Sequence, residues 1–242
     1  LADELELPVH MHVHETVDEV QRGISQHGRR PIARLDELGL VSPSLVAVHM
    51  TQLQDAEIER FAAAGAHVVH CPESNLKLAS GFCPVQRLLD AGINVALGTD
   101  GAASNNDLDM WGELRSAALL AKGVAGDASA LPAVQALQMA TLNGARALGL
   151  ADEIGSLVPG KAADLVAVDL QHLDTSPVFH PISQLVYALS RHQVSEAWIA
   201  GVPVLHQGEL TTLSAERVLA AAAAWGERIA AHAAASPGPQ PT

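Results

Sequence analysis

The sequence of 242 residues has few cysteines, few basic residues and no long apolar run. Its two cysteines, Cys71 and Cys83, indicate no disulfide framework, so we expect a reducing, cytoplasmic setting. The 14 Lys and Arg against 27 Asp and Glu give a formal net charge of −13. Nucleic-acid and anionic-membrane binders need basic surface, so we expect neither partner. No apolar run approaches the ~20 residues that cross a bilayer.

What the sequence does contain is an alternation of short apolar strands and helical segments over its first 125 residues. The chain is long enough for a sizeable core and for one or two domains. The alternation predicts parallel βα units whose strands are buried on both faces. Four such units make half of an eight-stranded barrel, a fold that builds its active site at the carboxyl ends of its strands. The predicted strands are 7–13, 45–50, 67–71 and 94–97, and the predicted helices are 16–27, 54–64, 85–91 and 108–122.

The pattern changes after Pro132. A helix is predicted over 132–148, because proline suits a first helical turn. Short β segments at 164–169 and 197–205 follow, with a hairpin over 201–210 that turns near Gln207–Gly208, and a last helix over 214–235 capped by Ser214. The ending SPGPQPT is predicted to be disordered. The expected domains are half a barrel over 1–150, part of a small β domain over 151–212, and a C-terminal helix with its tail over 213–242.

The string HMHVHET (10–16) is the first candidate site. On a strand, His10, His12 and His14 would share one face, because side chains alternate. Three imidazoles near a strand end can hold a divalent metal ion, with Glu15 beside them to move protons. The same pattern also fits a solvent-exposed polar edge.

Polar residues also follow the other three predicted strands. His49 closes one strand, and the polar, glycine-closed loop HCPESNLKLASG (70–81) leaves the next. His49 could instead be a structural, hydrogen-bonded histidine. The loop could instead be a turn that caps a helix, with Ser74 or Asn75 as the cap. Asp100 follows a third strand among small residues that let a ligand come close. Because residues 105–107 could cap the next helix, Asp100 is predicted to bind a metal ion and accept a proton from its water.

The order His/Glu, His, His, Asp on four successive strands resembles the amidohydrolase superfamily. It is most similar to the branch of 5-methylthioadenosine/S-adenosylhomocysteine deaminases, which is grouped with the triazine hydrolases. The resemblance extends to about residue 230 and implies the C-terminal half of a TIM-like (β/α)8 metal-dependent hydrolase barrel, strands 5 to 8, plus part of a small β-sandwich domain. The similar strings are SNLKLASGFCPVQRLLDAGINVALGTDGAASNNDLDMW, TLNGARALGL and GSLVPGKAADLVAVD.

The resemblance implies a role for each residue of the site. His12 would bind the metal ion, and Asp100 would be both a metal ligand and the base. Glu15 would shuttle protons, and His49 would hydrogen-bond the substrate or the metal-bound water. Glu15, His49 and Asp100 are thus the expected catalytic and substrate-binding residues. His10 and His14 have no assured role.

The implied cofactor is one divalent ion, with zinc expected first and iron or manganese as alternatives. The implied reaction is that of a hydrolase acting on C–N bonds. It converts 5′-methylthioadenosine or S-adenosylhomocysteine into the inosine analogue and ammonia. The expected partner is therefore a small-molecule nucleoside, and a homo-oligomer is left open.

Family members also carry an HxH pair on strand 1 that supplies two more metal ligands. The HxH strings of this sequence all lie within His10–His14, on the strand that matches strand 5. The resemblance thus implies that strands 1 to 4 lie outside this sequence, and we expect weak metal binding and no useful turnover from the chain alone. Two alternatives stay open: a related amidohydrolase acting on guanine-like, pterin or s-triazine rings, and a truncated, non-catalytic chain.

Overall fold

The computed structural model describes residues 2–5 and 7–235, and this chain forms two compact units. The first unit comprises residues 1–162 and 169–193, and the second comprises 163–168 and 194–242. Residues 151–162 and 169–193 therefore lie with the first unit, while the expected domain limits at 150 and 212 stay predictions. Among the described residues, no helix is long and apolar enough to span a membrane.

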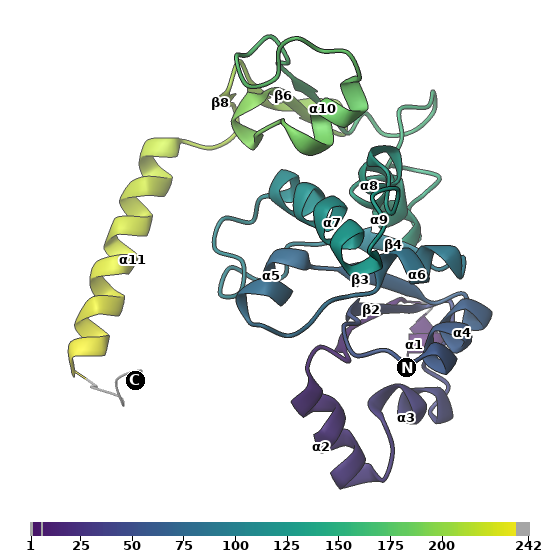
Figure 1. The fold of residues 1–242 in the computed structure, drawn as a ribbon. Helices are drawn as coiled ribbons and strands as arrows, with labels where there is room; N and C mark the ends of the chain where they lie inside the picture. Colours follow the sequence, from purple (N-terminus) through teal and green to yellow (C-terminus); the bar gives the residue numbers. More distant parts are fainter. Residues whose placement is uncertain (1, 6, 236–242) are drawn as a thin grey trace. The chain divides into compact units, whose positions relative to one another are not determined.

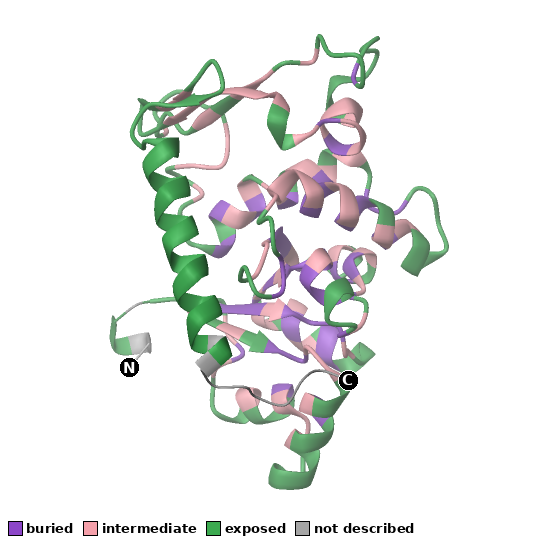
Figure 2. Ribbon diagram, turned by 90° about the vertical axis from the view of Figure 1, so that its left-hand side faces the viewer, coloured by how far each residue is buried: buried purple, intermediate pink, exposed green. Residues whose placement is uncertain are grey.

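The first unit is built on the predicted four-stranded parallel sheet, in the order β1-β2-β3-β4 (Figure 1). Val13 pairs with His49 and His70 pairs with Leu97, so the carboxyl ends of the strands lie along one edge. Figure 2 shows that burial is concentrated in this sheet and in the helix faces packed on it. The strands are β1 (Val9–Val13), β2 (Leu45–His49), β3 (His67–His70) and β4 (Asn94–Leu97).

The helices of the first unit include every helix predicted before residue 125. Thr16 caps α2 by accepting a hydrogen bond from the N–H of Glu19 at 3.1 Å, and Gln54 with Glu57 forms a capping box on α4. The helices are α1 (Ala2–Leu5), α2 (Val17–His27), α3 (Pro31–Glu37), α4 (Asp55–Ala64), α5 (Pro72–Lys77), α6 (Val85–Asp90), α7 (Met110–Ala125), α8 (Ala133–Met139), α9 (Leu142–Ala147), α10 (Pro181–Tyr187) and the 3₁₀ turn η1 (Arg191–Gln193).

Two expectations about these helices are wrong. The helix predicted over 132–148 is two helices, α8 and α9. Thr141 interrupts it with non-helical backbone angles, and its hydroxyl donates to the carbonyl oxygen of Leu137 at 2.8 Å. The segment after β3, read as a polar loop, contains α5, in which Pro72 starts the first turn with its φ already set for a helix.

The second unit contains an antiparallel sheet in the order β5-β6-β7-β8. The predicted strand 197–205 is wrong, because a turn at Ala200 and Gly201, both with positive φ, divides it into two strands. The predicted hairpin turn at Gln207 and Gly208 is confirmed. The strands are β5 (Leu165–Val168), β6 (Val194–Ile199), β7 (Val202–His206) and β8 (Glu209–Leu210).

The last helix, α11 (Ala215–Ala235), begins where it was predicted. The hydroxyl of Ser214 accepts a hydrogen bond from the N–H of Arg217 at 3.2 Å, which is the expected cap. Every described side chain of α11 is exposed (Figure 2). The tail predicted over 236–242 lies outside the described residues.

Candidate active site

Four polar side chains converge at the carboxyl edge of the parallel sheet. His12 lies on β1, Glu15 follows β1, His49 ends β2 and Asp100 follows β4. The Nε2 atom of His12 lies 3.8 Å from Oδ1 of Asp100, and the Nε2 atom of His49 lies 3.9 Å from Oδ2 of the same carboxylate. His49 Nε2 is also 3.7 Å from Oε2 of Glu15. All four residues predicted from the sequence are thus brought together around one small space.

The backbone at this edge bends in a way that L residues rarely adopt. His49 has a φ of 77° and Asp100 a φ of 60°, both in the left-handed region. Such conformations cost about 1–3 kcal/mol each and persist where the surrounding structure determines them. They turn both side chains towards the common space as the chain leaves the sheet.

His49 is held in a single orientation. Its ring is fully buried, and Nδ1 lies 2.8 Å from Oδ1 of Asn75. A carbonyl oxygen only accepts hydrogen bonds, so Nδ1 carries the proton and Nε2 presents a lone pair. In the described part of the chain, this buried Nε2 atom has no hydrogen-bond partner. It is therefore free to bind a cation or to accept a hydrogen bond from a ligand.

Asp100 is held by two hydroxyl groups on one oxygen. Ser74 Oγ donates to Oδ2 at 2.7 Å, and Ser104 Oγ donates to the same atom at 2.8 Å. Burial alone would raise the pKa of Asp100, but the two hydroxyls and the backbone N–H of Gly101 together hold that pKa below its ordinary value. Asp100 is therefore a carboxylate at neutral pH, with Oδ1 directed to His12.

Glu15 is fixed through both its backbone and its side chain. Its carbonyl oxygen accepts from the Thr51 hydroxyl at 2.6 Å, and its N–H donates to the Glu19 carboxylate at 2.6 Å. Ser80 Oγ donates to Oε1 at 3.2 Å, which leaves Oε2 facing the two histidines. A carboxyl group so placed can give a proton to a ligand in the common space when it is protonated, and can take one when it is ionised.

The residues of this cluster fit a divalent metal ion. Within the described ranges, the group of His, Cys, Asp and Glu side chains that could hold an ion is His12, His49 and Asp100, whose ligand atoms lie within 4.8 Å of one another. Two imidazole nitrogens and a carboxylate oxygen form a donor set that zinc accepts. The unpartnered Nε2 atom of His49 points to the same fit.

The sequence from residue 1 to residue 204 matches the amidohydrolase family. The chain belongs to this family. It is 54% identical over 230 residues to the 5-methylthioadenosine/S-adenosylhomocysteine deaminase of Teredinibacter turnerae, a match that covers 95% of this chain and 52% of that protein. It is 46% identical to the 5′-deoxyadenosine deaminase of Methanothermobacter thermautotrophicus, with 90% of this chain and 51% of that protein covered. The amidohydrolase chain thus spans about half the length of the curated relatives it matches.

Two solved structures share the fold of this chain. A zinc-bound adenosine deaminase from Xanthomonas campestris is 58% identical with a TM-score of 0.94, covering 95% of this chain and 52% of that one. The atrazine chlorohydrolase of Arthrobacter aurescens, complexed with zinc, is 29% identical with a TM-score of 0.87, covering 92% and 49%. The predicted family and the predicted fold class, a partial (β/α) barrel, are confirmed.

One geometric prediction for this amidohydrolase chain is wrong. His14 does not share the face of His12, because β1 ends at Val13 and His14 has a φ of 52°. Its ring is buried elsewhere, with Nε2 accepting from the N–H of Ile32 at 3.2 Å and Nδ1 lying 3.1 Å from the carbonyl oxygen of Gln52. His10 is exposed on β1. The site face of β1 thus contributes His12.

His70 also stays outside the cluster. Burial lowers the pKa of His70 to about 3, so its ring is neutral. The serines that hold the two carboxylates were not predicted as site residues, because the sequence pattern indicated only a helix cap for Ser74. Their signal was present, because Ser74, Ser80 and Ser104 lie in the same polar segments as the predicted site.

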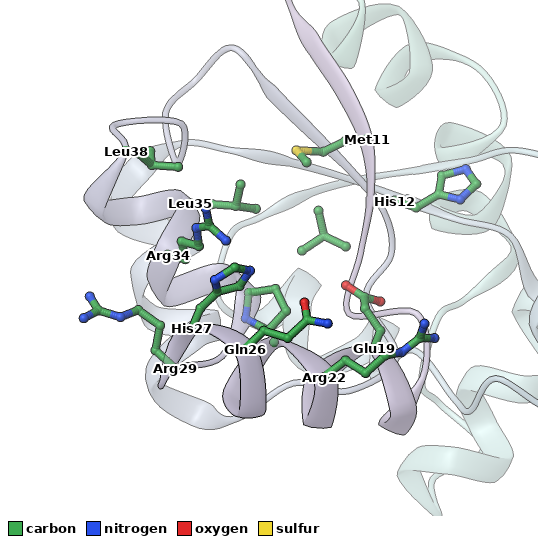
Figure 3. Close-up of a pocket in the computed structure, with 13 residues that line it drawn as sticks. Met11, His12, Glu19, Arg22, Gln26, His27, Arg29, Arg34, Leu35 and Leu38 are labelled. Carbon is green, nitrogen blue, oxygen red and sulfur yellow. The ribbon is translucent and has the colours of Figure 1, made fainter.

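A cavity of about 540 Å³ lies on the other face of β1 (Figure 3). In Figure 3, Met11 and Leu35 lie on one side of the strand and His12 points to the other side. The cavity is lined by residues of β1, α2 and α3, His12 among them, and by Arg22, Arg29 and Arg34. His49 and Asp100 do not line it, so the cavity does not coincide with the cluster of His12, His49 and Asp100.

Beneath the site, α7 buries a carboxyl group. Glu113 is fully buried, and its oxygens accept hydrogen bonds from the backbone N–H of Glu73 at 3.2 Å and from the side-chain amide of Asn105. Burial, helped by the charges of Glu73 and Asp107 and opposed by the two hydrogen bonds, raises the pKa of Glu113 to about 8. The folded protein therefore binds a proton here that the unfolded chain releases near pH 4.5.

This difference predicts a loss of stability as the pH rises. The contribution is fully present below about pH 4.5 and is lost as the pH approaches 8, with a slope of up to about 1.4 kcal/mol per pH unit. We expect Glu113→Gln to remove this slope in urea unfolding of the chain at pH 5, 6, 7 and 8. Glu59→Gln, at an exposed position on α4, is the control that keeps it. If the free energy of unfolding falls with pH by the same amount in wild type and in Glu113→Gln, the raised pKa of Glu113 is contradicted.

Proposed function

We propose that this chain provides the proton-transfer part of a metal-dependent amidohydrolase that deaminates adenosine-type substrates. The reaction converts 5′-methylthioadenosine or S-adenosylhomocysteine, with water, into the inosine analogue and ammonia. The convergence of His12, Glu15, His49 and Asp100 at one edge of the sheet carries the proposal. The deaminase names of relatives up to 54% identical support this choice of substrate.

In this proposal His12 and Asp100 hold one divalent ion, with zinc as the first candidate. Zinc is bound in the related structures from Xanthomonas campestris and Arthrobacter aurescens. A divalent ion in such a site supplies an acidified water, with a pKa lowered from ~15.7 towards ~7. The pair of residues leaves room for further ligands, which catalytic zinc sites require.

The side chains of the site divide the proton transfers between them. Asp100, kept ionised by Ser74 and Ser104, accepts the proton of the water that attacks C6 of the purine. Glu15, protonated at the start, gives its proton to the ring nitrogen and later takes back the proton of the new C6 hydroxyl, while the proton held by Asp100 passes to the amino group, which leaves as ammonia. His49, with its lone pair on Nε2, orients the attacking water and the tetrahedral centre that forms. We place this reaction in the cytoplasm, in keeping with two free, buried cysteines.

The test is a deamination assay on a fusion protein. The fusion joins the full chain to the part of the Teredinibacter relative that it does not match, in the order of that relative. With zinc, we expect turnover of 5′-methylthioadenosine and S-adenosylhomocysteine, followed by the loss of adenine absorbance and the release of ammonia. Removal of the metal ion by a chelator should abolish turnover, and added zinc should restore turnover.

The substrate panel separates the candidate reactions. Guanine and an s-triazine are offered beside the two adenosine analogues, and the unfused chain is assayed in parallel. Turnover confined to guanine or the triazine would replace the proposed substrate and keep the chemistry. A folded, zinc-loaded fusion that acts on none of them would overturn the proposal.

A further inference from the structure

Glu113 connects the two segments that hold Asp100. One oxygen of its carboxyl group accepts from the N–H of Glu73, which directly precedes Ser74. The other accepts from the amide of Asn105, which directly follows Ser104. The two serines donate to the same oxygen of Asp100. A single buried side chain on α7 therefore joins the neighbours of both hydroxyl groups.

The connection is held at each end. Ser74 is fully buried in the first turn of α5, next to Glu73. The Ser74 side chain can therefore move only together with this helix. Asn105 is buried too, and its Oδ1 atom accepts from the N–H of Leu108 at 3.1 Å. Its amide is thereby aimed at Glu113. The loop after β4 cannot shift without losing one of these bonds.

We propose that Glu113 is a positioning residue, which fixes the Asp100 carboxylate by tying the Ser74 and Ser104 segments together. The inference rests on the proposed role of Asp100 as metal ligand and base. A carboxyl group suits the task because it offers one acceptor oxygen to each segment. Loss of both oxygens would leave the Glu73 N–H and the Asn105 amide, which are buried donors, without acceptors. It would also free the Ser104 loop from α5.

A purely structural role predicts a different result. If Glu113 only packs α7 under the sheet, its loss lowers the melting temperature and leaves the folded site unchanged. If it positions Asp100, its loss also weakens metal binding in molecules that remain folded. Supporting groups behind metal ligands typically change metal affinity or activity by about 10–100-fold.

The experiment compares Glu113→Ala, Glu113→Gln and Thr175→Val in the fusion protein. Thr175 is a buried control away from the cluster, whose hydroxyl donates to the carbonyl oxygen of Leu170 at 2.8 Å, so Thr175→Val also removes a buried hydrogen bond. The readouts are the melting temperature, the zinc Kd by competition with a chromogenic chelator, and kcat and KM for 5′-methylthioadenosine.

For Glu113→Ala we expect a zinc Kd raised by about 10–100-fold and a kcat lowered to a similar extent. KM should change little, because Asp100 acts on water and the metal ion. Glu113→Gln keeps one acceptor oxygen and should restore part of both losses. Thr175→Val should lower the melting temperature and leave the zinc Kd and kcat unchanged.

Two outcomes would overturn the inference. One is a folded Glu113→Ala protein with the zinc Kd and kcat of wild type. The other applies if Glu113→Ala does not fold. In that case Asn105→Ala, which removes one hydrogen-bond partner of Glu113, is measured instead, and an unchanged zinc Kd and kcat would overturn the inference. A wild-type fusion that binds zinc but deaminates nothing would overturn the proposed function instead, and the Kd comparison would still decide the role of Glu113.

Discussion

Asp100→Asn in the fusion protein is expected to lower kcat/KM for 5′-methylthioadenosine on the order of 10⁴-fold, the upper end for a general base. The amide keeps the size of the side chain, and an oxygen can still accept from Ser74 and Ser104. It cannot accept the proton of the attacking water, and it is a poor ligand for zinc. The loss thus combines two roles of one carboxylate.

The matched control lies on the same loop. Asp107 is half exposed and pairs with Arg191 at 3.4 Å, so Asp107→Asn makes the same chemical change away from the cluster. We expect its kcat/KM to stay within about twofold of wild type, as for most surface substitutions. Steady-state rates at saturating zinc, with the zinc content measured for each protein, separate lost chemistry from lost metal. An Asp100→Asn protein within tenfold of wild type would remove Asp100 from the mechanism.

The parallel sheet and the location of the site could be predicted because they follow from local patterns. Short apolar strands separated by helical segments admit few arrangements, and parallel strands place their carboxyl ends at one edge. Residues that follow these strands, such as His49 and Asp100, therefore had to lie near one another. Family resemblance then supplied their roles.

What could not be predicted depended on single backbone angles. The alternation rule for β1 holds to Val13, and the left-handed φ of His14 then turns its ring into another environment. The break at Thr141 likewise depends on one hydroxyl that competes for a helix carbonyl. The role of Glu113 needed long-range geometry, because its partners lie eight and forty residues away in the sequence.

His12→Ala and His14→Ala should have opposite effects, although the two histidines lie two residues apart. His14 is buried, and its loss leaves the N–H of Ile32 without its acceptor and opens a cavity in the network of Arg30 and Glu57. We expect the free energy of unfolding of the chain to fall by about 3 kcal/mol in urea titrations. The zinc Kd of the folded fusion protein should stay near that of wild type.

For His12→Ala the expectation is reversed. The His12 side chain is 57% exposed, so its loss should change the stability of the chain by less than about 0.5 kcal/mol. Its Nε2 atom is nevertheless one of the two protein ligands proposed for the ion. Because supporting groups alone change metal affinity by about 10–100-fold, loss of a ligand should raise the zinc Kd by more than about 100-fold. If His14→Ala instead lost zinc and kept its stability, the three histidines would share one face after all. The positive φ that ends β1 would then be wrong.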